Sequence, residues 1–355
     1  MLNRKTSCST TLVVNRSIGL IAAATFVWLL LSGCSSEVKA PEPVVLSGPT
    51  MGTQFHIKYF LPASVTVSAE AIQGEIEARL AAVNQRMSTY LEDSELNRFN
   101  AAETGRWFAV SEDTAQVVSL ALEISRDTEG AFDVTVASLV DLWGFGPTHR
   151  EAEPPAAEQI STELAKVGYG SLQARLTPPA LRKETALTLD LSAIAKGYAV
   201  DLVAEYLGQV GIESYMVEVG GEIVARGHKP DGESWRIAVE SPVVSQREVQ
   251  RVIELSDIAV ATSGDYRNYF EKNGVRYSHT IDPITGYPIT HNLASVTVLA
   301  KTCARADALA TALNVMGPER ALAFANAHEL PVLLIVKEGN SFRELSSDAF
   351  AGWLN

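Results

Sequence analysis

The first 34 residues limit where this chain can fold. They contain Arg4, Lys5 and Arg16, no acidic residue, and then an apolar run over residues 18–31. A transmembrane helix needs about 20 apolar residues, which is more than this run provides. A basic start, a short apolar run and small residues before a cleavage site are typical of a secretory signal. We therefore expect residues 1–33 to be removed and the remainder to fold outside the cytoplasm.

The end of the leader also predicts a lipid anchor. Leu31-Ser32-Gly33-Cys34 resembles the bacterial lipobox, in which the cysteine is acylated, for example with palmitate. An uncleaved signal anchor is the alternative. We expect residues 34–46, which include two prolines, to form an extended tether. The 12 residues after Cys34 would reach roughly 37 Å at about 3.1 Å per residue. Residues 47–355 would then form the folded domain.

Composition narrows the function classes. Without the three basic residues of the leader, 26 basic and 42 acidic residues remain, a net charge of −16. Nucleic-acid binding depends on Lys and Arg contacts to phosphate, so this balance argues against it. Besides Cys8 and Cys34, only Cys303 is present, so no intrachain disulfide is expected. Cys303 is interpreted as a small buried residue at a strand end, with a nucleophile as the alternative.

Hydrophobic periodicity predicts an α+β fold. In residues 67–87, apolar side chains recur every three or four positions, as in an amphipathic helix. The second half contains short strands separated by turn residues, without a regular strand–helix alternation. A polar, proline-containing loop is expected at 147–157. Other expected helices are 94–100, 111–126, 193–209, 304–315 and 318–328, and expected strands are 51–60, 187–191, 215–219, 222–227, 235–239, 249–255, 259–262, 275–281, 293–301 and 331–337.

Three clusters in the first half could contact a ligand. Met51 lies in a glycine- and threonine-containing turn whose backbone could approach a phosphate or a ring. Tyr90 could stack on a planar ligand. The segment Ala131-Phe132-Asp133 follows a glycine and could hold an adenine or ribose. A plain turn, a half-buried tyrosine and a core phenylalanine with an aspartate cap are the structural alternatives.

A fourth cluster, residues 189–201, combines the predicted end of a strand with the start of a helix. Ser192 is a candidate N-cap, Asp190 lies at the strand end, and Lys196 falls in the first helical turns. A helix N-terminus with a lysine nearby can bind an anion. A structural ion pair between the acid and the lysine is the alternative.

Two further clusters could supply a base and a metal site. His279 precedes an Asp-Pro turn, and histidine readily takes a proton near neutral pH. A surface histidine is the alternative. Asp307 and Thr311 are four residues apart and therefore share a helical face. Their oxygens suit Mg²⁺, whereas no Cys/His pattern suggests zinc. A solvated aspartate is the alternative.

Together and in this order, the six clusters resemble the FAD:protein FMN transferase family, also called ApbE flavin transferases and formerly thiamine biosynthesis lipoproteins. The resemblance covers about residues 46–345 and implies an ApbE-like α+β fold. It implies Mg²⁺-dependent transfer of the FMN moiety of FAD to a threonine hydroxyl of a target protein, with release of AMP. It also implies FAD contacts by Met51, Tyr90, Ala131, Phe132, Asp133, Asp190, Lys196 and the backbone of Ile281, Mg²⁺ ligation by the Ala193 carbonyl, Asp307 and Thr311, and His279 as the base.

The resemblance extends to partners and location. It implies target subunits of membrane redox complexes, such as the Na⁺-pumping quinone reductase or its Rnf relatives. The lipid would place the protein on the periplasmic side of the inner membrane, with the outer membrane as the alternative. Two rival functions stay open, a Mg²⁺-dependent FAD pyrophosphatase and a lipoprotein that binds FAD without chemistry.

Overall fold

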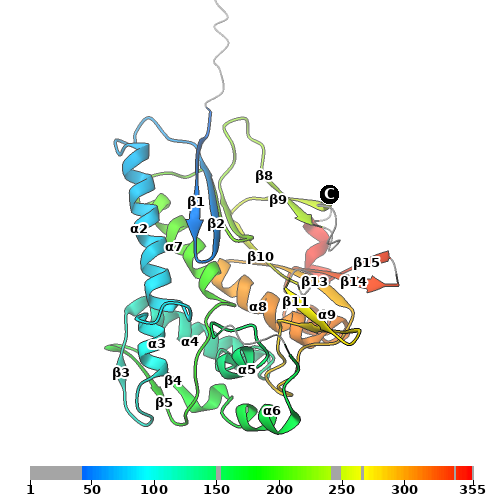
Figure 1. Cartoon of the computed structure of the whole chain (residues 1–355). Coiled ribbons are helices and arrows are strands. Elements are labelled where there is room, and N and C mark those ends of the chain that lie inside the picture. Colours follow the sequence, from blue (N-terminus) through cyan, green and yellow to red (C-terminus); the bar gives the residue numbers. More distant parts are fainter. Residues whose placement is uncertain (1–41, 149–152, 241–248, 265–267, 340, 354–355) are drawn as a thin grey trace, which may run out of the picture. The chain divides into compact units, whose positions relative to one another are not determined.

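A computed structural model describes residues 42–148, 153–240, 249–264, 268–339 and 341–353 (Figure 1). The leader and most of the expected tether, including Cys34, lie outside these residues. Strand β1 (Val44–Thr50) begins three residues inside the segment expected to be the tether, and its Leu46 is buried. Among the described helices, none combines the length and apolar character needed to cross a membrane.

An eight-stranded antiparallel sheet organises the domain, in the order β1-β2-β6-β7-β10-β13-β14-β15. Its other strands are β2 (Thr53–Tyr59), β6 (Tyr215–Val219), β7 (Glu222–Arg226), β10 (Ile258–Gly264), β13 (Leu293–Ala300), β14 (Val332–Glu338) and β15 (Ser341–Ser346). Smaller sheets pair β8 (Trp235–Glu240) with β9 (Val249–Leu255), β11 (Tyr269–Lys272) with β12 (Val275–Ser278), and β3 (Phe108–Ala109) with β5 (Pro179–Lys183) and β4 (Leu172–Leu176).

The two faces of the sheet pack differently because strand side chains alternate between them. Val224 and Leu334 belong to the larger core, whereas their neighbours Ala225 and Ile335 belong to a second core beneath β8 and β9. In Figure 1 the helices α2, α7 and α8 cover one face. The helices are α2 (Ala69–Met87), α3 (Glu95–Asn100), α4 (Glu112–Asp127), α5 (Ala137–Leu142), α6 (Ala157–Leu164), α7 (Ala195–Gln209), α8 (Cys303–Met316) and α9 (Pro318–Ala327), with 3₁₀ turns at Tyr169–Ser171 and Asp348–Trp353.

The α+β class and most of the long elements match the sequence-based expectation. Helix α2 buries Ile72, Ile76, Leu80 and Val83, the residues that defined its periodicity. Ser68, Ser94 and Ser111 accept backbone bonds at the starts of α2, α3 and α4. These caps are local signals, which explains why those helix starts could be read from the sequence.

Three local predictions were wrong. Residues 187–191 form no strand, and only one bridge joins Thr188 to Val136. Ser192 does not cap α7, which begins at Ala195 after Ile194 at φ −148°. Cys303 is fully buried as expected, but it is the first residue of α8 rather than the end of a strand. Each error concerns a boundary that long-range bonds set.

Candidate functional site

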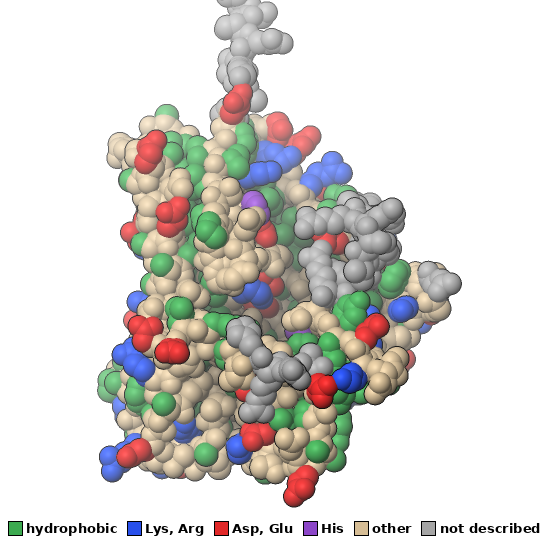
Figure 2. Space-filling model, viewed as in Figure 1, with side chains coloured by type: hydrophobic (Ala, Val, Ile, Leu, Met, Phe, Trp, Pro, Cys, Tyr) green, Lys and Arg blue, Asp and Glu red, His purple; other side chains and the backbone are tan. Residues whose placement is uncertain are grey.

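A cavity of about 450 Å³ is lined by residues of α5, α7, β10 and α8 and of the loops near them. The face seen in Figure 2 is hollowed near its middle, beside the β1–β2 hairpin. The cavity brings together eleven of the predicted site residues from segments that are far apart in the sequence. They are Tyr90, Ala131, Phe132, Asp133, Asp190, Ala193, Lys196, His279, Ile281, Asp307 and Thr311.

Met51 is the predicted site residue that does not line this cavity. It occupies the two-residue turn between β1 and β2, where Met51 and Gly52 both have positive φ (47° and 73°). This is the backbone of a tight hairpin turn. The hairpin does reach the edge of the cavity, because Gln54 O accepts the amide of the lining residue Gly220 (3.1 Å).

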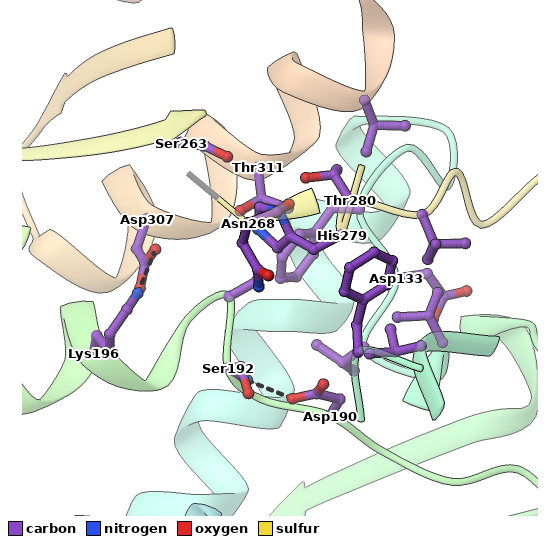
Figure 3. A pocket seen from close by; sticks show the side chains of 18 of the residues that line it. Asp133, Asp190, Ser192, Lys196, Ser263, Asn268, His279, Thr280, Asp307 and Thr311 are labelled. Atoms are coloured by element: carbon purple, nitrogen blue, oxygen red, sulfur yellow. Dashed lines mark hydrogen bonds and ion pairs between the residues drawn. The ribbon is translucent and has the colours of Figure 1, made fainter. Parts of the chain in front are cut away.

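The charged centre of the cavity is a lysine between two carboxylates. Lys196 Nζ lies 3.1 Å from Glu222 Oε1 and 3.7 Å from Asp307 Oδ1. Figure 3 shows the Lys196 and Asp307 side chains pointing toward each other from α7 and α8. Burial alone would lower the pKa of Lys196, but the Asp307 and Glu222 carboxylates raise it above its ordinary value. The lysine is therefore a fixed positive charge, whereas burial raises the pKa of Asp307 and raises that of Glu222 to about 8.

Asp307 also binds an amide in the first turn of α7. The Gly197 amide donates to Asp307 Oδ2 (3.0 Å), whereas in an uninterrupted helix it would donate to the carbonyl of Ala193, four residues earlier. The Ala193 carbonyl, on the cavity wall, is thus not engaged by that helical bond. Asp307, Thr311 and this carbonyl form a set of hard oxygen donors, as Mg²⁺ prefers.

Of the three predicted magnesium ligands, only Asp307 is a carboxylate. No group of three or more His, Cys, Asp or Glu residues with metal-binding geometry occurs within the described part of the chain. Glu222 is a further acid on the cavity wall, and its buried Oε2 has no hydrogen-bond partner. Mg²⁺ commonly takes one or two carboxylates, with water and substrate phosphate completing its shell. The residues therefore fit a magnesium ion that binds together with a phosphorylated ligand.

The backbone carbonyl of Asn268 contacts both the ring and the backbone of His279. Its Nδ1 lies 3.0 Å from the Asn268 carbonyl oxygen, and its backbone amide donates to the same atom at 3.1 Å. A carbonyl only accepts, so the neutral imidazole carries its proton on Nδ1 and its lone pair on Nε2. An imidazole held this way at a cavity wall can accept a proton through Nε2.

Several predicted ligand contacts come from residues that also stabilise the fold. Asp133 is 7% exposed, and its carboxylate accepts from Thr135 and from the Tyr169 amide. Burial raises the pKa of Asp133, against the effect of these bonds. Phe132 belongs to the main core. By contrast Tyr90 is 60% exposed, and partial burial together with the Asp190 carboxylate raises its pKa.

Sequence reasoning missed several lining residues. Glu222 follows the paired glycines 220 and 221, whose positive φ values turn β6 into β7 and bring the carboxylate to Lys196. The Gly-Gly-Glu sequence was a usable turn signal. Thr262, Ser263 and Asn268 gave no such signal, because nothing in their local sequence shows that β10 and the following segment border the cavity.

Comparisons with known proteins identify the family of the chain. Residues 51–334 match the model of the ApbE family. A Vibrio cholerae protein named FAD:protein FMN transferase is 51% identical over 337 residues, which cover 95% of this chain and 98% of that protein. An Escherichia coli K12 protein of the same name is 40% identical over 345 residues, 95% of this chain and 97% of its own.

Two solved structures share the fold. The flavin transferase ApbE from Vibrio cholerae is 50% identical, with a TM-score of 0.82 over 88% of this chain and 99% of its own. The Pseudomonas stutzeri flavinyl transferase ApbE, in its apo form, is 42% identical, with a TM-score of 0.83 over 89% and 98%. On these matches of sequence and structure, the chain belongs to the ApbE family.

Proposed function

We propose that this protein is a transferase that moves the FMN moiety of FAD onto a threonine hydroxyl of a target protein and releases AMP. Membership of the ApbE family and the names of the relatives support the flavin transfer. The observation that carries the proposal is the single cavity that joins the Lys196–Asp307–Thr311 cluster to His279. This arrangement combines a site for a pyrophosphate with a base for an incoming hydroxyl.

The residues around the cavity divide into ligand-binding groups. Tyr90 offers an exposed aromatic face for a planar ring, and the 131–133 loop, Asp190 and the backbone of Ile281 form other parts of the wall. Met51 lies outside the cavity lining, so its contact with FAD requires a ligand that extends toward the β1–β2 hairpin. Lys196 supplies positive charge to the pyrophosphate, on which negative charge grows as AMP leaves.

Magnesium is the proposed cofactor. Asp307, Thr311 and the Ala193 carbonyl would hold it, and when bound it would neutralise charge on the pyrophosphate. Lys196 remains held by Glu222 at 3.1 Å.

The transfer step forms one bond and breaks one. The threonine oxygen attacks the phosphorus of the FMN moiety, and the bond between this phosphorus and the oxygen bridging to AMP breaks. The hydroxyl proton passes to Nε2 of His279, and AMP departs with the bridging oxygen. A threonine hydroxyl is a weak nucleophile, so a placed base contributes roughly 10²- to 10⁴-fold. The target remains a threonine-bearing subunit of a membrane redox complex, of the Na⁺-pumping quinone reductase or Rnf type.

The anchor is part of the proposal. A lipid on Cys34 would hold the domain at the periplasmic surface of the inner membrane, beside membrane-bound targets. The outer membrane is the alternative location. The short reach of the tether favours targets that expose their threonine close to the lipid surface.

Mass spectrometry of the protein with FAD, Mg²⁺ and a threonine-bearing acceptor domain tests the function. We expect the acceptor to gain the mass of an FMN group, AMP to appear in equal amount, and both to vanish in EDTA and return with added Mg²⁺. An acceptor with Thr→Val at the target position is the control. AMP with free FMN and no acceptor modification would indicate the pyrophosphatase instead. Bound FAD without any product would indicate a binding protein.

A further inference from the structure

Helix α3 touches the cavity with none of its residues, yet it holds two of the segments that line it. Two asparagines on this six-residue helix make the relevant bonds. One secures the loop that carries Tyr90, and the other secures the segment that carries Asp190. These two residues approach the cavity from different parts of the chain, so a common support fixes their separation.

Asn97 secures the Tyr90 loop. Its Nδ2 donates to the carbonyls of Thr89 and Leu91, both at 2.9 Å. These carbonyls flank Tyr90, whose own amide donates to Ser88 Oγ at 3.1 Å. Tyr90 is therefore an exposed side chain on a backbone that is fixed on both sides.

Asn100 secures the segment before Asp190. Its Nδ2 donates to the Leu189 carbonyl (3.0 Å), and its Oδ1 accepts from the Leu189 amide (2.8 Å). The side-chain amide thus pairs with Leu189 as a neighbouring strand would. On the other edge, the Asp190 amide donates to the Val134 carbonyl (2.8 Å). This explains how residues 187–191 stay extended without belonging to a strand.

A buried lysine reinforces the second support. Lys183 is 3% exposed, and its Nζ donates to the carbonyls of Asn100 (2.6 Å) and Leu187 (3.3 Å). The helix itself is fixed by the buried Leu96 and Phe99 and by Glu95, which accepts two bonds from Ser111. Helix α3 is therefore anchored well enough to act as a rigid support.

We propose that α3 is a structural support that fixes the position of Tyr90 relative to Asp190, with Asn97 and Asn100 as positioning residues. The inference rests on the proposed function, because it takes Tyr90 and Asp190 as flavin-nucleotide contacts. Neither asparagine lines the cavity. Each acts through the backbone beside a cavity residue, which Asn97 holds on both sides of Tyr90 and Asn100 holds just before Asp190.

Single variants measure the size of the effect. Asn97→Ala removes both donated bonds, and Asn100→Asp keeps the acceptor for the Leu189 amide but loses the donor to its carbonyl. We expect each to raise the Kd of FAD, measured by quenching of flavin fluorescence, by roughly three- to tenfold. Arg98→Ala is the matched control, since this exposed side chain lies on the same helix and outside the cavity lining. Thermal unfolding identifies any variant that fails to fold, and Asn100→Gln replaces Asn100→Asp in that case.

Double-mutant cycles separate positioning from general destabilisation. In a Tyr90→Ala background, Asn97→Ala should have little further effect on the Kd, whereas in an Asp190→Asn background its effect should persist. Asn100→Asp should show the opposite pattern. The proposal would be overturned if the effects on the Kd were additive in all four double mutants. It would also be overturned if Arg98→Ala weakened FAD binding as much as the asparagine variants do. If the unmutated protein fails to bind FAD, the proposed function fails first, and that titration alone reveals it.

Discussion

The imidazole of His279 is placed with its Nδ1 3.0 Å from the backbone carbonyl oxygen of Asn268. A histidine before a turn is common, so the sequence alone left a surface residue and a base equally open. The structure adds that His279 lines the cavity and that its Nδ1 meets the carbonyl oxygen of Asn268. The same holds for Asp307, whose helical spacing from Thr311 was readable but whose bond to Gly197 was not.

The first prediction concerns this base. His279→Gln should lower the rate of FMN transfer by roughly 10²- to 10⁴-fold and change the Kd of FAD by less than about threefold. The glutamine amide can still donate to Asn268, but it has no basic nitrogen. Single-turnover transfer to an acceptor domain measures the rate, and fluorescence quenching measures binding. Full transfer activity in this variant or in His279→Ala would show that another group takes the proton.

At the scale of elements, α7 and α8 approach so closely that Gly197 has no room for a side chain. A Cβ there would lie 2.4 Å from the Cys303 carbonyl oxygen and 2.6 Å from its carbon, both backbone atoms. Such overpacking typically costs about 1–3 kcal/mol, and here the helices themselves must move. We expect Gly197→Ala to lower the free energy of unfolding by at least this amount and to weaken FAD binding.

Gly208, on the same helix, is the matched control. A Cβ there would meet nothing within 4 Å, so Gly208→Ala should raise the free energy of unfolding by about 0.4–1 kcal/mol. Urea denaturation measures both variants. If Gly197→Ala is as stable as Gly208→Ala, the close contact of the two helices is not a constraint on the site.

A buried carboxylate at the start of α8 should make the stability of the protein depend on pH. The Asp201 carboxylate accepts from the amides of Cys303 (2.8 Å) and Ala304 (2.9 Å), and burial raises its pKa to about 6. Between the ordinary value of 3.8 and about 6, the folded protein holds a proton that the unfolded chain has lost. This contribution to stability is therefore present at low pH and decreases as the pH rises from about 4 to about 6.

Asp201→Asn removes that dependence. Between about pH 4 and pH 6, the unfolding free energy of the unmutated protein should fall by up to about 3 kcal/mol relative to that of the variant. Above about pH 6 the difference between the two proteins should stay constant. Urea denaturation at intervals between pH 4 and 7 measures the difference, with Asp231→Asn, an exposed aspartate, as the control. Parallel curves for the unmutated protein and Asp201→Asn would contradict the assignment.

Local signals explain which elements could be predicted. Each serine cap of α2, α3 and α4 accepts from an amide three residues later, and the apolar residues of α2 recur every three or four positions. Strands β1, β3, β4, β5, β11 and β15 and helices α5 and α6 were missed, and in neither of these two helices does the N-cap side chain bond the first turn. The segment 187–191 was mistaken for a strand because Asn100, far away in the sequence, takes the place of a partner strand.

At the scale of the whole molecule, the cavity draws residues from position 90 to position 315. No periodicity could predict that assembly, because each segment reaches the cavity through long-range strand pairing and helix packing. The family resemblance identified eleven of its lining residues in advance. Glu222, which holds Lys196, fell outside that pattern and needed the structure.

The anchor gives a prediction that applies to the full chain. Expressed in a bacterium, the protein should carry fatty acyl groups on an N-terminal peptide that begins at Cys34, and it should partition into detergent. Cys34→Ala should lose the acyl mass, whereas Cys8→Ala, with its change in the leader, should keep it. An unmodified Cys34 in the unmutated protein would refute lipidation.

If the anchor serves to hold the domain near its target, unmutated protein in vesicles should modify a membrane-embedded acceptor faster than Cys34→Ala does, while both modify a detached acceptor domain equally. That difference would arise from local concentration alone, because a detached acceptor domain does not depend on the anchor.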